Sequence, residues 1–203
     1  MEYAQSLSRL VAYFAQNQVF DGVVQTITTD ALMGSNIGGN YENMVKKYLA
    51  DDKIRWTHFL SIEDDMSFPA DGLHTLARHK LAIVGANYPT NKGYPLRFTT
   101  SQGPTQVVTN EESTGIEEVN YLPQGFTLVA REVYEKMKRP WFLNGYNTVT
   151  ETYICQDYYF SERAKEAGFK SFVDHDVSKQ MLHVGASSFS YRNVPVEEEI
   201  SNG

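Results

Sequence analysis

Three consecutive carboxylates, Glu63, Asp64 and Asp65, follow an apolar run at residues 57–62. Such a run predicts a strand, and in an open α/β sheet ligands bind outside the carboxyl ends of the strands. Carboxylates separated by one residue can share a hard cation such as Mg²⁺ or Mn²⁺, which neutralises phosphate groups. The alternative is a solvated turn that caps a helix starting at Pro69. These residues alone leave both interpretations open.

Two more side chains are candidates for the same chemistry. Asp157 opens an expected helix, where a carboxylate serves either as a general base or only as a favourable charge for the helix dipole. His183 lies in an apolar stretch, where it is either a ligand for Mn²⁺ or a histidine of the core. Gly125, between two expected strands, would let the backbone approach a ligand closely.

Alternating helices and strands have to position these side chains. Apolar residues at helical spacing predict helices at residues 2–16, 41–49, 69–78, 131–137 and 156–167. Runs of β-branched and apolar residues predict strands at residues 23–28, 57–62, 81–86, 119–122, 126–130 and 169–173. Asn40 is the expected N-cap of the second helix, and Gly168 the left-handed stop of the last.

This order predicts an α/β fold, a three-layer sandwich around a mixed, mostly parallel sheet with an antiparallel edge. Residues 87–118 are rich in Thr, Ser, Gln and Gly, so we expect them to form a small β-rich excursion over the cleft. No linker divides the sequence, which predicts a single domain over residues 1–203. The acidic end, residues 190–203, is expected to be a flexible tail.

Composition narrows the function classes. The 203 residues carry a formal net charge of −7, which argues against tight binding to nucleic acid or to anionic membranes. Cys155 is the only cysteine, so the chain does not depend on an intrachain disulfide. No segment approaches the roughly 18 apolar residues of a membrane span, and no basic signal-peptide start is present. We therefore expect a cytoplasmic protein that makes no membrane contact.

Several segments together resemble the GT-A glycosyltransferases encoded by bacteriophages and related bacteria. The resemblance lies in residues 57–69, 83–89, 124–129 and 157–168, and its order and spacing extend to Gly185. It implies a GT-A, Rossmann-like fold and a transferase that uses a nucleoside-diphosphate sugar. A phage-encoded member would work in the host cytoplasm.

The resemblance also assigns roles to residues. The D-x-D motif of the family is carried here as Glu63-Asp64-Asp65, so Asp65 and Glu63 are the expected ligands of Mn²⁺ or Mg²⁺. The late histidine of the family falls on His183, the expected further ligand. Asp157 is the expected general base of an inverting reaction. The expected donor-binding residues are Asp64, Gly125, Asn87, Tyr88, Asn40 and Thr28.

The chain departs from the family in three places. It begins on a helix, so the usual first strand, whose loop grips the nucleobase, is expected to be absent or to be supplied by another chain or by upstream sequence. It has residues 39–41, Gly-Asn-Tyr, where many relatives have an arginine that contacts the nucleotide, and it has Glu63 in place of the first aspartate. Nucleotide binding is therefore expected to differ from that of the relatives.

The sequence thus predicts a metal-dependent enzyme that transfers a sugar to an acceptor hydroxyl. The acceptor is left open among a modified base of phage DNA, a glycan and a protein. Two alternatives remain: a non-catalytic module on the same fold that binds nucleotides or carbohydrates, and a metal-dependent phosphohydrolase. A two-metal hydrolase would need more histidine and aspartate ligands than this cleft is expected to offer.

Overall fold

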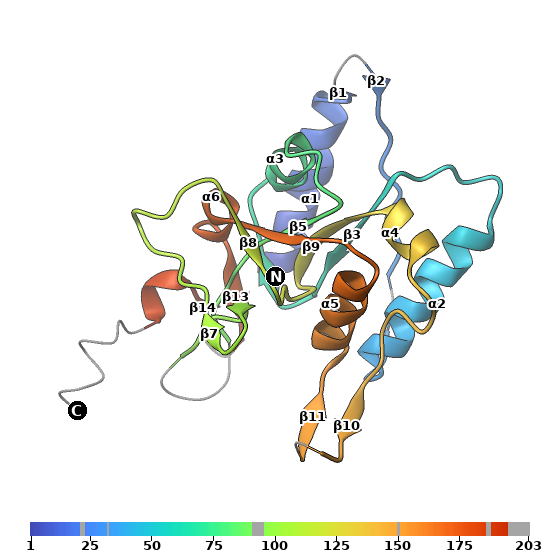
Figure 1. Cartoon of the computed structure of the whole chain (residues 1–203). Helices are drawn as coiled ribbons and strands as arrows, with labels where there is room; N and C mark the ends of the chain where they lie inside the picture. The colour runs from blue at the N-terminus through green and yellow to red at the C-terminus, as the bar shows by residue number, and fades with distance from the viewer. Residues whose placement is uncertain (21–22, 32, 91–95, 150, 186–187, 195–203) are drawn as a thin grey trace.

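The structure is a computed structural model that describes residues 1–194 except 21–22, 32, 91–95, 150 and 186–187 (Figure 1). The helices are α1 (Glu2–Gln16), α2 (Ile37–Ala50), α3 (Gly72–Arg78), α4 (Arg131–Lys136), α5 (Gln156–Glu166) and α6 (His175–Ser178), with a 3-10 helix η1 (Tyr191–Asn193). The main strands are β3 (His58–Ile62), β5 (Ile83–Gly85), β8 (Ile116–Val119), β9 (Phe126–Ala130) and β12 (Ser171–Asp174).

These five strands form one mixed sheet in the order β3-β9-β5-β12-β8. Only β5 and β12 are parallel neighbours, whereas β3–β9, β9–β5 and β12–β8 are antiparallel. The prediction of a mostly parallel sheet is therefore wrong. The cause is β9, which inserts between β3 and β5 and runs against both. The alternation of helices and strands along the chain does not reveal this insertion.

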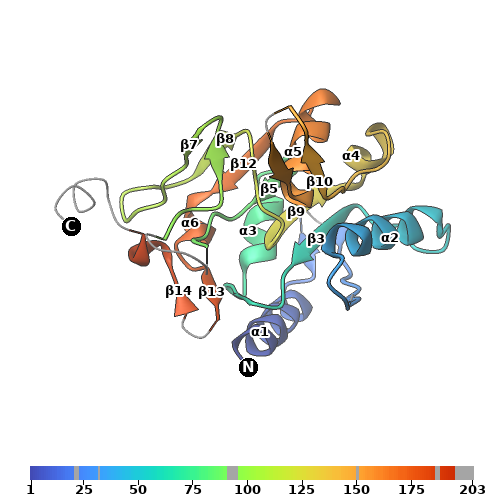
Figure 2. The same cartoon turned by 90° about the horizontal axis from the view of Figure 1, so that it is seen from below.

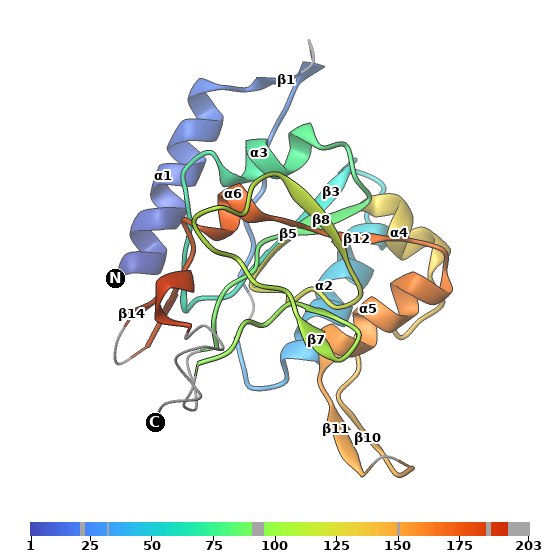
Figure 3. The same cartoon turned by 60° about the vertical axis from the view of Figure 1, so that its left-hand side comes forward.

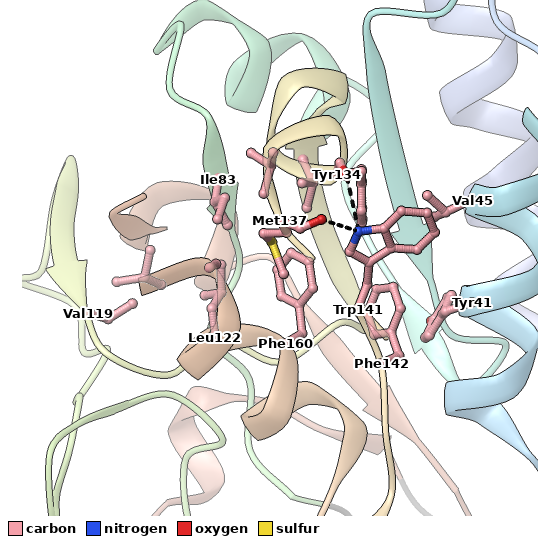
Figure 4. Close-up of a cluster of buried hydrophobic side chains, with 14 of the residues drawn as sticks. Tyr41, Val45, Ile83, Val119, Leu122, Tyr134, Met137, Trp141, Phe142 and Phe160 are labelled. Carbon is pink, nitrogen blue, oxygen red and sulfur yellow. Dashed lines mark hydrogen bonds between the residues drawn. The ribbon is translucent and has the colours of Figure 1, made fainter. Parts of the chain in front are cut away.

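Helices α2, α4 and α5 cover one face of this sheet (Figures 1 and 3). Their core contains Tyr134 of α4, Phe160 of α5 and the side chains of Phe142 and Trp141 (Figure 4). The rings of Phe142 and Phe160 stack at a centroid distance of 5.0 Å, and the Trp141 indole N–H donates to the carbonyl oxygens of Tyr134 (3.0 Å) and Met137 (3.2 Å). This indole bond removes the cost of burying a polar group in an aromatic core.

Helices α1, α3 and α6 cover the opposite face, with a second core that includes Leu10, Leu76 and Val177. Successive residues of the central strands point to opposite faces, so Leu128 of β9 belongs to this core and Val129 to the other. Both faces of the centre of the sheet are thus apolar, which explains why β5 and β9 are mostly apolar in sequence.

Small sheets surround the main one. Strands β4 (Met66–Ser67), β13 (Leu182–Val184) and β14 (Ser188–Phe189) form one, on the opposite side of the molecule from α2 (Figures 1 and 2). The hairpin of β10 (Gly145–Asn147) and β11 (Thr152–Ile154) projects away from the body next to α5 (Figures 1 and 3). The β6 (Ser101–Gln102) and β7 (Thr105–Gln106) hairpin lies within the expected β-rich excursion, of which residues 91–95 lie outside the described residues.

The strand predicted at residues 23–28 is not part of the main sheet. Only β2 (Val23–Val24) is extended there, paired with β1 (Val19–Phe20), and residues 25–30 have no regular secondary structure. The prediction of Asn40 as N-cap is also wrong, because α2 begins earlier and Asn36 accepts the cap hydrogen bond from the Gly39 amide. Isoleucine and two glycines in the first turn hide this start from a search for apolar periodicity.

The other predicted helices occur close to their expected positions. Gly168 ends α5 at φ +86°, as predicted. Tyr191 of η1, within the predicted tail, is buried, and residues 195–203 of that tail lie outside the described residues. No helix in the described part of the chain is long and apolar enough to cross a membrane.

Candidate active site

The predicted acidic cluster occupies the turn between β3 and β4. The amide of Glu63 donates to the carbonyl of Gly125 (3.1 Å), which fixes the turn to the start of β9. The amide of Met66 donates back to the Glu63 carbonyl (3.2 Å), and the Asp65 carbonyl accepts from the amide of Val184 in β13 (2.7 Å). Backbone hydrogen bonds thus hold three segments that lie far apart in the sequence.

His183, in β13, points its ring at this turn. Its Nε2 lies 3.1 Å from Asp65 Oδ2, and its Nδ1 lies 2.8 Å from the carbonyl oxygen of Pro89. A carbonyl oxygen only accepts, so Nδ1 carries a proton and Nε2 is the atom that faces Asp65. The ring is buried and packs edge-on against Tyr88, at a centroid distance of 5.4 Å.

The His183–Asp65 contact has two chemical states. Burial lowers the pKa of His183, but hydrogen bonds to Asp65 and Pro89 outweigh it and raise the pKa overall. Without a cation, Asp65 therefore favours the protonated form of the imidazole. With a cation, neutral Nε2 and Oδ2 are both available as ligands, and the Nδ1 bond to a backbone carbonyl is the usual support of a metal-binding histidine.

Glu63 lies close to this pair but does not complete a larger ligand group. Within the described residues, no three His, Cys, Asp or Glu side chains are arranged to hold a metal ion. The predicted trio of Glu63, Asp65 and His183 is thus represented by one contacting pair and a neighbour. This still fits Mg²⁺ or Mn²⁺, because such ions often take only one or two protein ligands and complete their shell with phosphates and water.

The pKa of Glu63 shows that other carboxylates lie within electrostatic range of it. Burial, followed by the charges of Asp157 and Asp65, raises the pKa of Glu63 to about 7. Asp157 comes from α5, nearly a hundred residues away in the sequence, and its charge acts on Glu63 in the folded chain. Negative charges that raise the pKa of a neighbouring carboxylate also favour the binding of a cation.

Asp157 itself is buried in the first turn of α5. Burial raises its pKa to about 6, although hydrogen bonds from the Gln124 backbone and the Gln156 side chain act in the opposite direction. Its Oδ1 is buried with no hydrogen-bond partner within the described residues. A carboxylate with a free lone pair and a pKa near neutrality has the properties of a general base.

Gly125 and Tyr88 both lie at the site, but a contact between them accounts for the glycine without a ligand. The amide of Gly125 donates to the Tyr88 hydroxyl (2.9 Å), and a Cβ at position 125 would lie 2.2 Å from that oxygen. The glycine is therefore required by the tyrosine. Tyr88 is buried, and burial together with the charge of Glu63 raises the pKa of its phenol.

The remaining expected donor-binding residues do not converge as clearly. Asn87 is fully buried. Its side-chain amide donates to the carbonyl oxygen of Val107 (2.8 Å) and to the hydroxyl of Thr109 (3.1 Å), so it stabilises the β-rich excursion. Asn40 lies inside α2, with its amide 3.4 Å from the carbonyl of Gly34. Asp64 and Thr28 are both exposed.

A cavity of about 560 Å³ lies at the start of α5, beside Asp157. Its lining comes from the β6 segment, Tyr121, the β10–β11 hairpin and the first residues of α5: Thr99, Ser101, Tyr121, Asn144, Gly145, Tyr153, Ile154, Cys155 and Tyr158. The sequence interpretation missed these residues. The available signal was the spacing of Tyr153, Cys155 and Tyr158 around Asp157.

Comparisons with known proteins add one finding about the fold. No family model matches the chain, and no curated protein matches it. The structure is similar to the crystal structure of A197 from STIV, with a TM-score of 0.53 and 16% sequence identity over 87% of this chain and 78% of that chain. At this identity, the similarity concerns the fold alone.

Proposed function

We propose that this protein is a metal-dependent glycosyltransferase that moves a sugar from a nucleoside diphosphate to an acceptor hydroxyl. One observation carries the proposal. Asp65 of the β3–β4 turn contacts His183 of β13, and the charges of Asp157 from α5, Asp65 and His183 all act on the pKa of Glu63. A cation-binding pair beside a separate buried base is what this transfer requires.

The same proposal includes a more specific assignment of the fold. We assign a GT-A, Rossmann-like arrangement, supported by helices on both faces of a mixed sheet and by the acidic turn at the end of β3. The chain would act in the cytoplasm, where nucleotide sugars are made, and in the host cytoplasm if a phage encodes it.

Asp65 and His183 would hold Mn²⁺ or Mg²⁺, with Glu63 beside them. When bound, the cation would neutralise the negative charge of the diphosphate leaving group. The fixed Nδ1–H bond of His183 to Pro89 directs Nε2 toward Asp65 and holds the ring in place before any ligand arrives. Glu63 adds negative charge that increases the affinity of the site for a cation.

Asp157 would remove the proton from the acceptor hydroxyl. The acceptor oxygen attacks the anomeric carbon from the face opposite the diphosphate while the bond from that carbon to the diphosphate oxygen breaks, so the configuration inverts. The proton ends on Asp157, and the electron pair leaves with the diphosphate. The raised pKa makes Asp157 a stronger base than an exposed aspartate, while most of it is still ionised at neutral pH.

A thermal-shift screen tests the proposal. UDP-, GDP-, CDP- and TDP-sugars are each added with and without Mn²⁺, because a ligand of the folded state raises its melting temperature. We expect one nucleotide to raise the melting temperature in the presence of Mn²⁺. If none does with any metal, the transferase proposal fails.

The second candidate is a non-catalytic module that binds nucleotides or carbohydrates. It is favoured by the main sheet, in which no strand of the described residues precedes β3 along the chain. Asp157→Asn separates the two candidates. In an enzyme it preserves donor binding and abolishes sugar transfer, whereas in a module wild type and variant show the same binding and no transfer.

We do not propose the phosphohydrolase, because no three acidic or histidine side chains group as ligands within the described part of the chain.

A further inference from the structure

A cavity lies beside α5, next to the proposed catalytic base. Its volume of about 560 Å³ falls in the range of roughly 300–1,000 Å³ that is usual for small-molecule sites. Cys155 is the N-cap of α5 and Tyr158 lies in its first turn, so both flank Asp157 in the sequence and line the cavity.

Tyr121 connects the cavity to the acidic site. Its hydroxyl lies 3.8 Å from the Cys155 sulfur, and its ring lies 6.0 Å from that of Tyr158, tilted by 33°. Burial, and next the charge of Asp157, raises the pKa of the Tyr121 phenol, and Glu63 contributes in the same direction. The cavity is thus within electrostatic range of the carboxylate that would accept the proton.

The lining has a distinctive chemistry, because none of its nine residues is charged. Three tyrosines, Tyr121, Tyr153 and Tyr158, supply aromatic faces with polar edges. Thr99 and Asn144 add a hydroxyl and an amide. This combination matches a sugar ring, whose C–H face packs on an aromatic ring while its hydroxyl groups need donors and acceptors.

Charge disfavours nucleic acid as the acceptor. A nucleic acid would need cations for its phosphates, yet the lining has no lysine or arginine, and Glu63 and Asp157 lie nearby. The net charge of −7 adds repulsion over longer distances. An uncharged ligand avoids both costs.

We propose that this cavity binds the acceptor, and that the acceptor is an uncharged glycan held by Tyr121, Tyr153 and Tyr158 with one hydroxyl directed at Asp157. The proposal rests on the proposed transferase function for the role of the bound glycan. The β10–β11 hairpin then forms one wall of the acceptor site, and Tyr153, which is 89% exposed, is available to close on a ligand.

Cys155 gives a direct test, because it is the only cysteine of the chain, is exposed and lines the cavity. Its alkylation by iodoacetamide is followed by intact-protein mass spectrometry, with and without a nucleoside diphosphate and Mn²⁺. The probes are neutral methyl glycosides and disaccharides, such as lactose, cellobiose and maltose. Oligothymidylate, a serine- and threonine-containing peptide and choline represent the other ligand classes.

We expect at least one neutral sugar to slow alkylation by about tenfold near saturation, as mass action gives for a site that is about 90% occupied. Tyr153→Ala and Tyr158→Ala should remove this protection. Val149→Ala, at an exposed position of the same hairpin outside the cavity lining, should retain it. Each variant is compared with itself in the absence of sugar, so a changed intrinsic reactivity of Cys155 does not affect the result.

The proposal is overturned if no neutral sugar protects Cys155, if oligothymidylate, the peptide or choline protects it instead, or if both tyrosine variants keep full protection. The thermal shift with nucleotide and Mn²⁺ is measured on the same samples and should be equal in all three variants. Loss of that shift with retained sugar protection would defeat the transferase proposal but leave carbohydrate binding at the cavity. A retained shift without sugar protection would defeat only the cavity proposal.

Discussion

Asp157 combines burial with a pKa of about 6, so its ionisation should control the rate of transfer. We expect kcat/KM to rise with pH and to reach half its maximum near pH 6, because only the ionised carboxylate accepts the acceptor proton. A pH profile of the wild type measures this. Asp157→Asn should have no measurable transfer at any pH, and the exposed-site variant Asp52→Asn should reproduce the wild-type profile. A wild-type rate that is flat from pH 5 to pH 8 would exclude this base.

The same pKa predicts that Asp157 lowers stability at neutral pH. The folded pKa of about 6 exceeds the ordinary value of 3.8, so the folded state binds the proton more tightly. The contribution of this group to stability is greatest at low pH and is lost as pH rises from about 4 to about 6. We expect Asp157→Asn to increase the free energy of unfolding by about 1–3 kcal/mol at pH 7.5. Urea denaturation at pH 7.5 and pH 4.5 measures this, and the difference should shrink at the lower pH.

His183 should matter for the cation more than any other histidine. His183→Ala removes Nε2 from the pair with Asp65, so we expect the affinity for Mn²⁺ to fall at least about tenfold, as for changes around other metal sites. Free Mn²⁺ measured by electron paramagnetic resonance gives the affinity directly. His58→Ala, at an exposed position on β3, is the matched control. Equal Mn²⁺ affinity in both variants would remove His183 from the site.

At the scale of elements, Glu42 fixes α2 to the segment that leads into the β10–β11 hairpin. Its carboxylate accepts from Arg139 (2.7 Å) and from the backbone amides of Trp141 (2.8 Å) and Phe142 (3.3 Å). Glu42→Ala would leave those buried amides without an acceptor, so we expect a loss of about 2–4 kcal/mol in urea denaturation.

The matched control for Glu42 is Glu132→Ala. Glu132 makes an exposed pair with Lys136, one turn away on α4, and such pairs contribute at most about 0.5 kcal/mol. If Glu42→Ala lowers the free energy of unfolding no more than Glu132→Ala does, the hydrogen bonds of Glu42 do not stabilise the fold. The hairpin also forms a wall of the proposed acceptor cavity, so a loosened anchor should weaken sugar protection of Cys155 without changing nucleotide binding.

The elements also show how far the sequence could predict this fold. Helices α1 and α5 were predicted to within about a residue, because their apolar spacing, and Gly168 after α5, are local signals. The position of β9 between β3 and β5 was not predictable in this way. Its apolar residues Phe126, Leu128 and Val129 suit any central strand, and its neighbours are set by packing on both faces. The prediction of a strand at residues 23–28 was wrong for a related reason, since β-branched composition does not guarantee a partner strand.

At the scale of the whole molecule, the candidate site was predictable in part. The acidic turn, Asp157 and His183 were selected as residues that follow strands or open a helix, and the structure brings them together. The tyrosines of the cavity were not selected, because 13 tyrosines are spread through the sequence and only the folded chain shows which ones share a surface. Asn87 was selected as a ligand residue but serves a buried hydrogen-bond network, which the sequence cannot distinguish from a binding site.

The arrangement of charges over the whole site predicts that nucleotide and cation bind cooperatively. Glu63, Asp65 and Asp157 repel a diphosphate when no cation is present. Among the described residues, a cation without a diphosphate would have the Asp65–His183 pair as ligands, with Glu63 beside it. Each ligand therefore supplies what the other lacks, and by linkage each should raise the affinity of the other by the same factor.

We expect the melting temperature to rise more with Mn²⁺ and the preferred nucleoside diphosphate together than the sum of the two separate shifts. The expected coupling of about 1–3 kcal/mol corresponds to a change in affinity of roughly 5- to 150-fold. Differential scanning fluorimetry with each ligand alone and with both measures it. Asp65→Asn should remove the excess while retaining the fold, because it keeps the side-chain shape and removes the negative charge that holds the cation. Additive shifts in the wild type would mean that the cation and the nucleotide bind at separate places, and the acidic turn would then not be a donor site.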